Sequence, residues 1–368
     1  MMKFGLSRIC ITARLEMNLL GHPVSLKSDG IYTNLYSRAI YLSDAKTEIL
    51  IISNDLCMLP SETQAFIRAE ISRHTGINPE NIIVHTTHAH AGPAVSEVFN
   101  QSNADNEDQK KIIGLIIDAG AGAYKNKING SMSSGKTALK GISFNRRYVM
   151  KNNTVETHPF KDDPNLLEAE GPDDPELNVL MFFDENNNIK GLLANFVCHL
   201  TSNHRKNTKF SADFPAHAEK NLQAYFNDST LVMLYLNGAC GNLCQYMKTD
   251  FWKKIEAHEL LKLYEQYKDN NLENVPVTLA RISDILLVTI PGEIFVEYGL
   301  KIKEALKNKY SNIFIGELCN AYVGYIPTPK AFKYKDSGYE TRLLTSGKLA
   351  ENAGEIITNE ILRIEKRL

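Results

Sequence analysis

Residues 48–86 read EILIISNDLCMLPSETQAFIRAEISRHTGINPENIIVHT, and they give the clearest indication of the fold class. The apolar run Glu48–Ser53 predicts a buried β-strand. Residues Ser61–Arg73 open with Ser-x-x-Gln, which resembles a helix capping box, and continue with helical periodicity. A second apolar run, Asn81–Thr86, predicts another strand. Strand, helix and strand in this order indicate a layered α/β structure.

The same alternation continues along the rest of the chain. It predicts an α/β fold in which mixed β-sheet layers are flanked by helices, formed by one domain over residues 1–368. The polar stretch Lys151–Glu176 is the only candidate boundary, and it is equally compatible with a long loop across the mouth of a site. Further strands are expected at Leu177–Phe183, Gly191–Cys198, Leu231–Leu236 and Ile285–Ile290, and further helices at Asp213–Phe226, Glu293–Leu306 and Lys348–Glu365.

The composition excludes several classes of protein. Forty-one Lys and Arg residues against 43 Asp and Glu residues give a net charge of −2, so nucleic acid and anionic membranes are not expected as partners. No run reaches the roughly 18 apolar residues of a membrane-spanning helix, and the start of the chain leads into the alternating run Ile9–Leu15 rather than a signal peptide. The six cysteines form no CxxC pair. We therefore expect a cytoplasmic protein with reduced thiols.

The sharpest local motif is the His-x-His formed by His88 and His90. It follows the strand Asn81–Thr86 at a turn that ends in Gly92 and Pro93. Residues two apart on an extended segment face the same way, so both histidines can reach one ion or one substrate. Loop histidines that bond to backbone groups are the alternative, and His85 is expected to be structural.

Three other residues stand at the ends of predicted strands, and each has an ordinary explanation when it is taken alone. His199 follows an apolar strand, where histidines are often satisfied polar groups. Glu293 follows Pro291-Gly292 at the expected start of a helix, where the helix dipole favours a carboxylate. Tyr325 lies beside prolines, where tyrosines usually serve in packing.

Taken together and in order, these segments resemble the catalytic domain of the neutral, non-lysosomal ceramidases. The matching blocks are Thr87-His-Ala-His-Ala-Gly-Pro93, Phe144-Asn-Arg-Arg147, Phe196-Val-Cys-His199, Pro291-Gly-Glu293, Tyr322-Val-Gly-Tyr325-Ile-Pro-Thr-Pro329 and Tyr339-Glu340. The resemblance implies a Zn²⁺ site with the ligands His88, His199, Glu293 and Tyr325. It also places His90 against the substrate amide, supplies Arg146 as an active-site arginine and sets Tyr339 against the reacting carbonyl.

The resemblance implies a zinc-dependent amidohydrolase that cleaves a linear N-acyl bond of a small, lipid-like substrate with metal-activated water. Two features depart from the family. Cys244 stands where the family has its site serine, and the chain has no room for the C-terminal β-domain of full-length ceramidases. Cys244 is therefore a ligand, a nucleophile or a buried thiol. A metal-binding homologue without activity and a thiol-dependent acyl hydrolase that uses Cys244 remain as alternatives.

Overall fold

The structure, a computed structural model, describes residues 2–21, 25–44, 46–95, 106–160, 162–201, 207–245, 273–342 and 346–368. Its main element is an eight-stranded mixed sheet with the order β14-β12-β11-β6-β1-β3-β4-β5. β4 pairs with β5, and β12 with β14, in parallel, whereas the other neighbours are antiparallel. The strands are β1 (Lys3–Cys10), β3 (Tyr36–Ser43), β4 (Glu48–Asn54), β5 (Ile82–Thr86), β6 (Ile128–Ala138), β11 (Glu176–Asp184), β12 (Ile189–Phe196) and β14 (Val232–Asn237).

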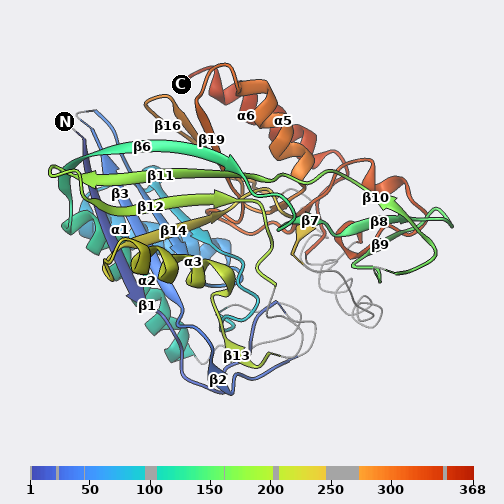
Figure 1. Ribbon diagram of the computed structural model, residues 1–368, viewed down its shortest axis with the longest axis horizontal. Helices are drawn as coiled ribbons and strands as arrows, with labels where there is room; N and C mark the ends of the chain where they lie inside the picture. Colours follow the sequence, from blue (N-terminus) through green and yellow to red (C-terminus); the bar gives the residue numbers. More distant parts are fainter. Residues whose placement is uncertain are drawn as a thin grey trace.

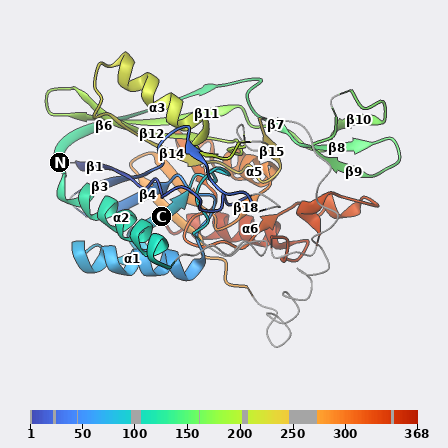
Figure 2. The same cartoon turned by 90° about the horizontal axis from the view of Figure 1, so that it is seen from below.

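The sheet folds over on itself between β1 and β6. These two strands pair only at Lys3↔Asn129 and Phe4↔Ile128, and β14 packs against β3, β4 and β5. The two halves of the sheet therefore face each other. Figure 2 shows the resulting layers, with helices α1 (Ser61–Thr75) and α2 (Asn106–Lys125) outside one half and α3 (Asp213–Tyr225) outside the other.

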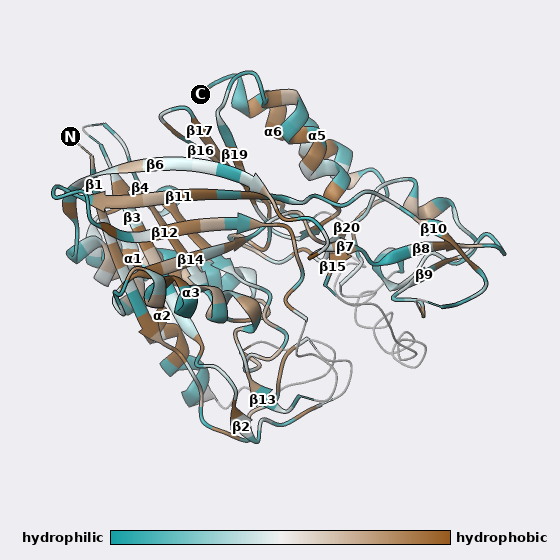
Figure 3. Ribbon diagram, viewed as in Figure 1, coloured by the Kyte–Doolittle hydropathy of each residue, from teal (hydrophilic) through white to brown (hydrophobic). Residues whose placement is uncertain are grey.

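Alternating side chains explain this layering. On β3, Ala39 and Tyr41 pack toward α1 and α2, whereas Ile40 and Leu42 point into the space between the two halves. β4 follows the same period of two, which is the period of side chains along a strand. Figure 3 shows apolar residues along these strands and polar residues on the outward parts of the helices. The core between the halves consists of Phe4, Ile40, Leu42, Ile51, Ile83, Leu180, Phe182, Leu193, Leu234, Leu236, Ile285, Leu287, Phe314 and Cys319.

A second sheet completes this core. It has the order β16-β17-β19, formed by Thr278–Ile282, Ile285–Thr289 and Asn312–Gly316, and β17 and β19 are parallel. Helices α5 (Val296–Leu306) and α6 (Ala353–Glu365) pack on it, as Figure 1 shows. Among the described residues, no helix has the length and apolar character needed to cross a membrane.

Short strands connect the sheets to the site. β7 (Phe144–Asn145) pairs with β15 (Leu243–Cys244), and β18 (Glu293–Ile294) pairs in parallel with β20 (Tyr325–Ile326). The remaining elements are β2 (Gly30–Ile31), β13 (Lys209–Phe210), β8 (Arg147–Met150), β9 (Val155–Thr157), β10 (Leu166–Ala169) and the 3-10 helices η1 (Pro79–Asn81), η3 (Ala331–Lys333) and η4 (Tyr339–Thr341).

The predicted mixed α/β architecture is confirmed, with differences at particular elements. The helix expected from Glu293 begins at Val296, because Glu293 and Ile294 pair with β20 instead. The helix expected from Lys348 begins at Ala353. The alternating run Ile9–Leu15 is not a strand, since β1 ends at Cys10. The polar stretch Lys151–Glu176 contains β9 and β10, which form a three-stranded sheet with β8.

Candidate metal centre

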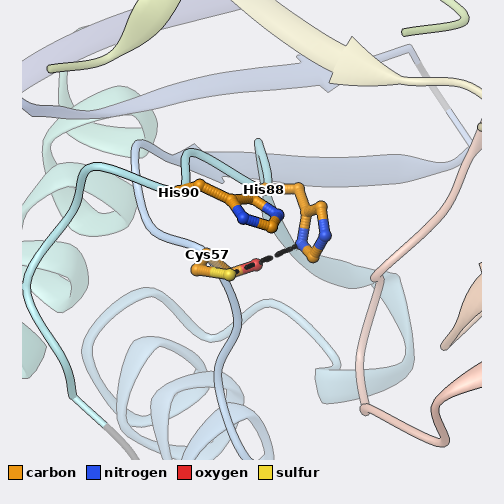
Figure 4. A group of neighbouring side chains, drawn as sticks. All are labelled: Cys57, His88 and His90. Carbon is orange, nitrogen blue, oxygen red and sulfur yellow. Dashed lines mark hydrogen bonds between the residues drawn. The ribbon is translucent and has the colours of Figure 1, made fainter. Parts of the chain in front are cut away.

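His88 lies just after β5, at the carboxyl end of a parallel strand. Its backbone φ is 64°, a left-handed conformation that non-glycine residues rarely adopt. The turn directs the ring inward, where Nδ1 lies 2.9 Å from the carbonyl oxygen of Cys57 (Figure 4). A ring nitrogen beside a carbonyl oxygen carries the proton. His88 therefore presents the lone pair of Nε2 to the interior.

His199 follows β12 and is fully buried. Its Nδ1 lies 2.8 Å from the carbonyl oxygen of Cys240, so this histidine also carries its proton on Nδ1. The rings of His88 and His199 lie edge to face with centroids 4.7 Å apart. Both Nε2 atoms are consequently turned toward the same point.

That point is the carboxylate of Glu293 on β18. Oε2 of Glu293 lies 3.3 Å from His88 Nε2 and 3.2 Å from His199 Nε2. Its other oxygen accepts a hydrogen bond of 2.9 Å from the hydroxyl of Tyr322. All of the ligand atoms in the group His88, His199 and Glu293 lie within 4.8 Å of one another, and the three residues are buried.

The donor set fits a zinc ion. Tetrahedral zinc with bonds of about 2.0–2.1 Å holds its ligand atoms about 3.3 Å apart, close to the separations between Glu293 and the two histidines. His88 Nε2 is buried and has no hydrogen-bond partner among the described residues. The three atoms that face one another suit a shared cation. Ligating histidines commonly hold their second nitrogen on a carbonyl, as His88 and His199 do here.

The electrostatics around Glu293 agree with this fit. Burial opposes the ionisation of Glu293, but the two histidines outweigh burial and hold its pKa well below the usual range. Burial, reinforced by the charge of Arg146, lowers the pKa of His199 to about 3. Burial lowers the pKa of His88, but Cys57 and Glu293 outweigh burial and raise it well above the usual value. Glu293 and His199 thus have the protonation states that bind a metal, and a metal would displace a proton from His88.

Tyr325 lies beside this centre but is held differently. It is the strand partner of Glu293 across β18 and β20, and its hydroxyl accepts a hydrogen bond of 3.2 Å from Arg146 Nη2. Burial and the charge of Glu293 raise the pKa of Tyr325 well above its usual value, so the phenol is neutral.

Arg146, Tyr339 and His90 gather around the same centre. The Arg146 guanidinium lies 5.5 Å from the Tyr339 ring and 5.6 Å from the Tyr325 ring, and Nη2 donates to the carbonyl of Gly241 at 2.7 Å. The His90 ring lies 4.6 Å from that of His88, and its Nδ1 lies 3.0 Å from the Gly21 carbonyl oxygen. Every residue that the resemblance implies is thus brought into one buried region.

Cys244 lies in the wall of this region, on β15. Its backbone forms an isolated bridge with His199, and its sulfur lies 3.7 Å from Nδ1 of His158. The described part of the chain has a second group of possible ligand atoms, from Cys57, His88 and His90, and neither group includes Cys244. The sequence indicates no histidine partner for this thiol, and the structure places His158 beside it.

Sequence reasoning gave no role to several residues that build the site. Cys57 and Cys240 accept hydrogen bonds from the two histidines through their carbonyls, and Tyr322 bonds to Glu293. Glu340 is fully buried and pairs with Arg146 Nε at 3.2 Å and with Arg147 Nη1 at 2.8 Å. Backbone carbonyls leave no trace in residue type, but the Tyr-Glu sequence at 339–340 was a signal for Glu340.

His85 has the structural position expected of it. Its Nδ1 lies 2.8 Å from the Ser53 hydroxyl, and its Nε2 accepts a hydrogen bond of 3.3 Å from the Asn237 backbone. Both ring nitrogens are therefore used in joining β4, β5 and β14.

Comparison with known proteins gives a consistent assignment. The family model for neutral/alkaline non-lysosomal ceramidase, N-terminal, matches residues 3–235. The chain is 24% identical to the neutral ceramidase of Pseudomonas aeruginosa over 223 residues, which are 59% of this chain and 32% of that protein. It is 25% identical to neutral ceramidase B of Dictyostelium discoideum over 221 residues, 56% of this chain and 29% of that protein. The alignments thus cover about a third of these relatives.

Solved structures extend the likeness to the whole fold. The crystal structure of the Pseudomonas aeruginosa neutral ceramidase matches with a TM-score of 0.77 at 17% identity, over 100% of this chain and 75% of that one. A ceramidase complexed with C2 matches with a TM-score of 0.80 at 16% identity, over 100% and 76% of the two chains. The expected ceramidase-like fold is confirmed, and the chain belongs to the neutral/alkaline non-lysosomal ceramidase family.

Proposed function

We propose that this chain is a zinc-dependent hydrolase that cleaves an N-acyl amide bond. The observation that carries the proposal is the convergence of His88 Nε2 and His199 Nε2 on one oxygen of Glu293, with both Nδ1 atoms held on backbone carbonyls. Family membership supports amide hydrolysis, because the relatives are named as ceramidases. Tyr325 is the proposed fourth ligand, since its strand pairing sets it beside Glu293.

Zinc in this site would lower the pKa of water to about 7 and polarise a substrate carbonyl. The surrounding residues then have separate tasks. Arg146 and Tyr339 donate hydrogen bonds to the negative charge that develops on the carbonyl oxygen. Burial raises the pKa of Tyr339, so its hydroxyl keeps the proton it needs to donate. His90, whose proton is fixed on Nδ1 by the Gly21 carbonyl, carries its lone pair on Nε2 and faces the amide nitrogen.

A lipid-like acyl amide is the proposed substrate class, because the named relatives act as ceramidases. The acyl and amine halves are best identified by a panel of N-acyl amides with matched O-acyl esters. We expect amide hydrolysis that stops with a chelator and returns when zinc is added back. A purified chain that holds no stoichiometric zinc, or that keeps full activity in the chelator, would contradict the proposal.

One observation favours a second candidate, a thiol-dependent acyl hydrolase. Cys244 Sγ lies 3.7 Å from His158 Nδ1, which is a thiol and imidazole pair in the wall of the site. The two mechanisms differ in a simple way, because a thiol enzyme keeps its activity when the metal is removed. The panel with and without chelator therefore separates them, and a metal-binding homologue without catalysis would hold zinc and hydrolyse nothing.

A further inference from the structure

Behind His199, on the side away from Glu293, lies a buried pair formed by a thiol and a carboxylate. The sulfur of Cys240 is 2.9 Å from Oε1 of Glu317 and 3.3 Å from Nδ1 of His199. Cys240 and Glu317 are fully inaccessible to solvent. Neither the sequence motifs nor the proposed reaction gives this pair a task.

Glu317 holds Cys240 at two places. Its Oε2 accepts a hydrogen bond of 3.1 Å from the backbone N–H of Cys240, and its Oε1 accepts one from the thiol. Burial raises the pKa of Glu317 to about 8, and a carboxyl group buried in this way is costly unless hydrogen bonds satisfy it. An apolar side chain of similar size would fill this volume without that cost, so stability alone does not explain a carboxylate here.

The loop that Glu317 holds carries two consecutive carbonyl groups that point at the active site. The carbonyl of Cys240 accepts from His199 Nδ1 at 2.8 Å, and the carbonyl of Gly241 accepts from Arg146 Nη2 at 2.7 Å. The two carbonyls belong to adjacent peptide units, so a displacement of this segment would move both acceptors. The orientation of a metal ligand and that of the active-site arginine thus depend on one short segment.

Glu317 is itself anchored to regular structure. It immediately follows β19, which pairs in parallel with β17, and its N–H donates to the carbonyl of Asn237 at the end of β14 at 3.0 Å. The backbone of Glu317 is therefore held where two sheets meet, and this fixes the origin of its side chain.

We propose that Glu317 is a positioning residue for the metal centre, which acts through Cys240 to fix the carbonyls that orient His199 and Arg146. The inference rests on the proposed zinc site, and it adds a residue that touches neither the metal ligands nor a substrate. Residues that orient metal-bound histidines typically change metal affinity by about 10–100-fold when they are replaced. Zinc affinity is therefore the direct readout.

The test compares four variants by competition with a chromogenic zinc chelator. Glu317→Gln keeps the shape of the side chain, and Cys240→Ala removes the thiol link. Both should weaken zinc binding by about tenfold or more. Cys240→Ser, whose hydroxyl can still donate to Glu317, should bind close to the unmodified chain. Glu365→Gln is the matched control, because Glu365 is also buried and hydrogen-bonded, to Tyr310, but lies in α6.

The outcomes separate this inference from the proposed function. If the unmodified chain retains no zinc, the proposed function fails first. If it binds zinc and both Glu317→Gln and Cys240→Ala bind equally well, Glu317 does not position the centre. A loss of the same size in Glu365→Gln would also overturn the inference, since it would reflect general destabilisation. Should Cys240→Ala not fold, Glu317→Gln and Cys240→Ser decide the matter.

Discussion

The backbone conformation of His88 costs free energy that the surrounding structure must offset. A left-handed φ at a non-glycine residue costs on the order of 1–3 kcal/mol and persists only where the surroundings determine it. Here the carbonyl of Cys57 and the carboxylate of Glu293 face the two ring nitrogens. Strain of this kind is common at functional sites, and it agrees with a ligand whose direction must be fixed.

His88→Ala and His199→Ala are each expected to abolish zinc retention while the chain stays folded. Each substitution removes one of the three converging ligand atoms and little core volume. Elemental analysis of the purified variants, with circular dichroism to check folding, measures this. His74→Ala is the control, because His74 is exposed on α1 and should leave the zinc content unchanged. Full zinc occupancy in either ligand variant would show that the ligands are assigned wrongly.

Tyr339→Phe is expected to keep the zinc and to slow turnover. The hydroxyl lies on a ring packed near Arg146 and Tyr325, and the loss of one oxyanion donor typically lowers kcat about 10²–10³-fold. Steady-state kinetics on the best amide substrate gives kcat. Tyr310→Phe removes a hydroxyl that bonds to Glu365, and it serves as the control. An unchanged kcat in Tyr339→Phe would leave Tyr339 with a packing role only.

Cys244 distinguishes the two candidate mechanisms. With the ligand set complete without sulfur, Cys244→Ser should retain most of the rate and Cys244→Ala a measurable part, and neither should release zinc. If the thiol attacks, both variants lose activity, because a covalent intermediate needs that sulfur. Mass spectrometry of the intact protein during turnover is the independent check. An acyl group trapped on Cys244 would establish the thiol mechanism.

The pairing of β18 with β20 sets Glu293 beside Tyr325, and two glycines make that pairing possible. A Cβ atom on Gly292 would lie 2.5 Å from the carbonyl oxygen of Gly324, and Gly324 has a φ of +86°. Gly292→Ala should therefore force the two strands apart and lower both thermal stability and zinc affinity. Gly114→Ala, in α2 with open space around the added methyl group, should stabilise the chain by about 0.4–1 kcal/mol.

Thermal melts and chelator competition on the two glycine variants test this argument about β18. Both measurements are needed, because Gly292→Ala is expected to lower the melting temperature and the zinc affinity together. If Gly292→Ala melts at the normal temperature with normal zinc affinity, the close approach of the two backbones does not control the site.

The sequence predicted most long elements correctly because their signals are local. The run Glu48–Ser53 and the helical periodicity from Ser61 correspond to β4 and α1, and the later apolar runs correspond to β11, β12, β14 and β17. The expected capping box is wrong, since Pro60 stands at the N-cap of α1 and no side chain of the described residues caps the helix. The short strand β18 was misinterpreted, because a carboxylate after Pro-Gly has the pattern of a helix start. Glu293 is a strand residue because it pairs with Tyr325, which lies 32 positions later. A pairing between such distant residues leaves no pattern in the local sequence.

The site forms where three pairs of parallel strands end. His88 follows β5, His199 follows β12, and Glu293 lies after β17, so each strand delivers its side chain at its carboxyl end, where open α/β sheets usually bind ligands. These strands belong to both halves of the folded sheet and to the second sheet. Residue patterns cannot show which strand ends meet, so the proposed ligands were predicted from the resemblance to a family. The contacts of the Cys57 and Cys240 carbonyls could not be predicted in either way.

A buried ion network around Arg38 links the two halves of the sheet. Arg38 lies on β3, and its guanidinium pairs with Asp55 at 2.7 Å and with Glu219 on α3 at 2.7 Å. Glu219 also accepts a hydrogen bond from the backbone of Met233 on β14 at 3.0 Å. One arginine thus links the layer of β3 to the layer of β14 and α3.

Arg38→Met should destabilise the whole chain by about 3–5 kcal/mol, because it leaves the buried Asp55 without its cation and leaves Glu219 with Arg8 alone, at 3.6 Å. Urea unfolding measures the loss. Arg363→Met is the control, since Arg363 pairs with Glu360 on an exposed face of α6 and such pairs contribute about 0.2–1 kcal/mol.

Burial already raises the pKa of Asp55, and removal of Arg38 raises it further. A carboxyl whose pKa is higher in the folded than in the unfolded state binds protons more tightly when folded, so lower pH favours folding. The deficit of Arg38→Met relative to the unmodified chain should therefore narrow as the pH falls. A deficit that is constant with pH, or no larger than that of Arg363→Met, would mean that other contacts hold the two halves together.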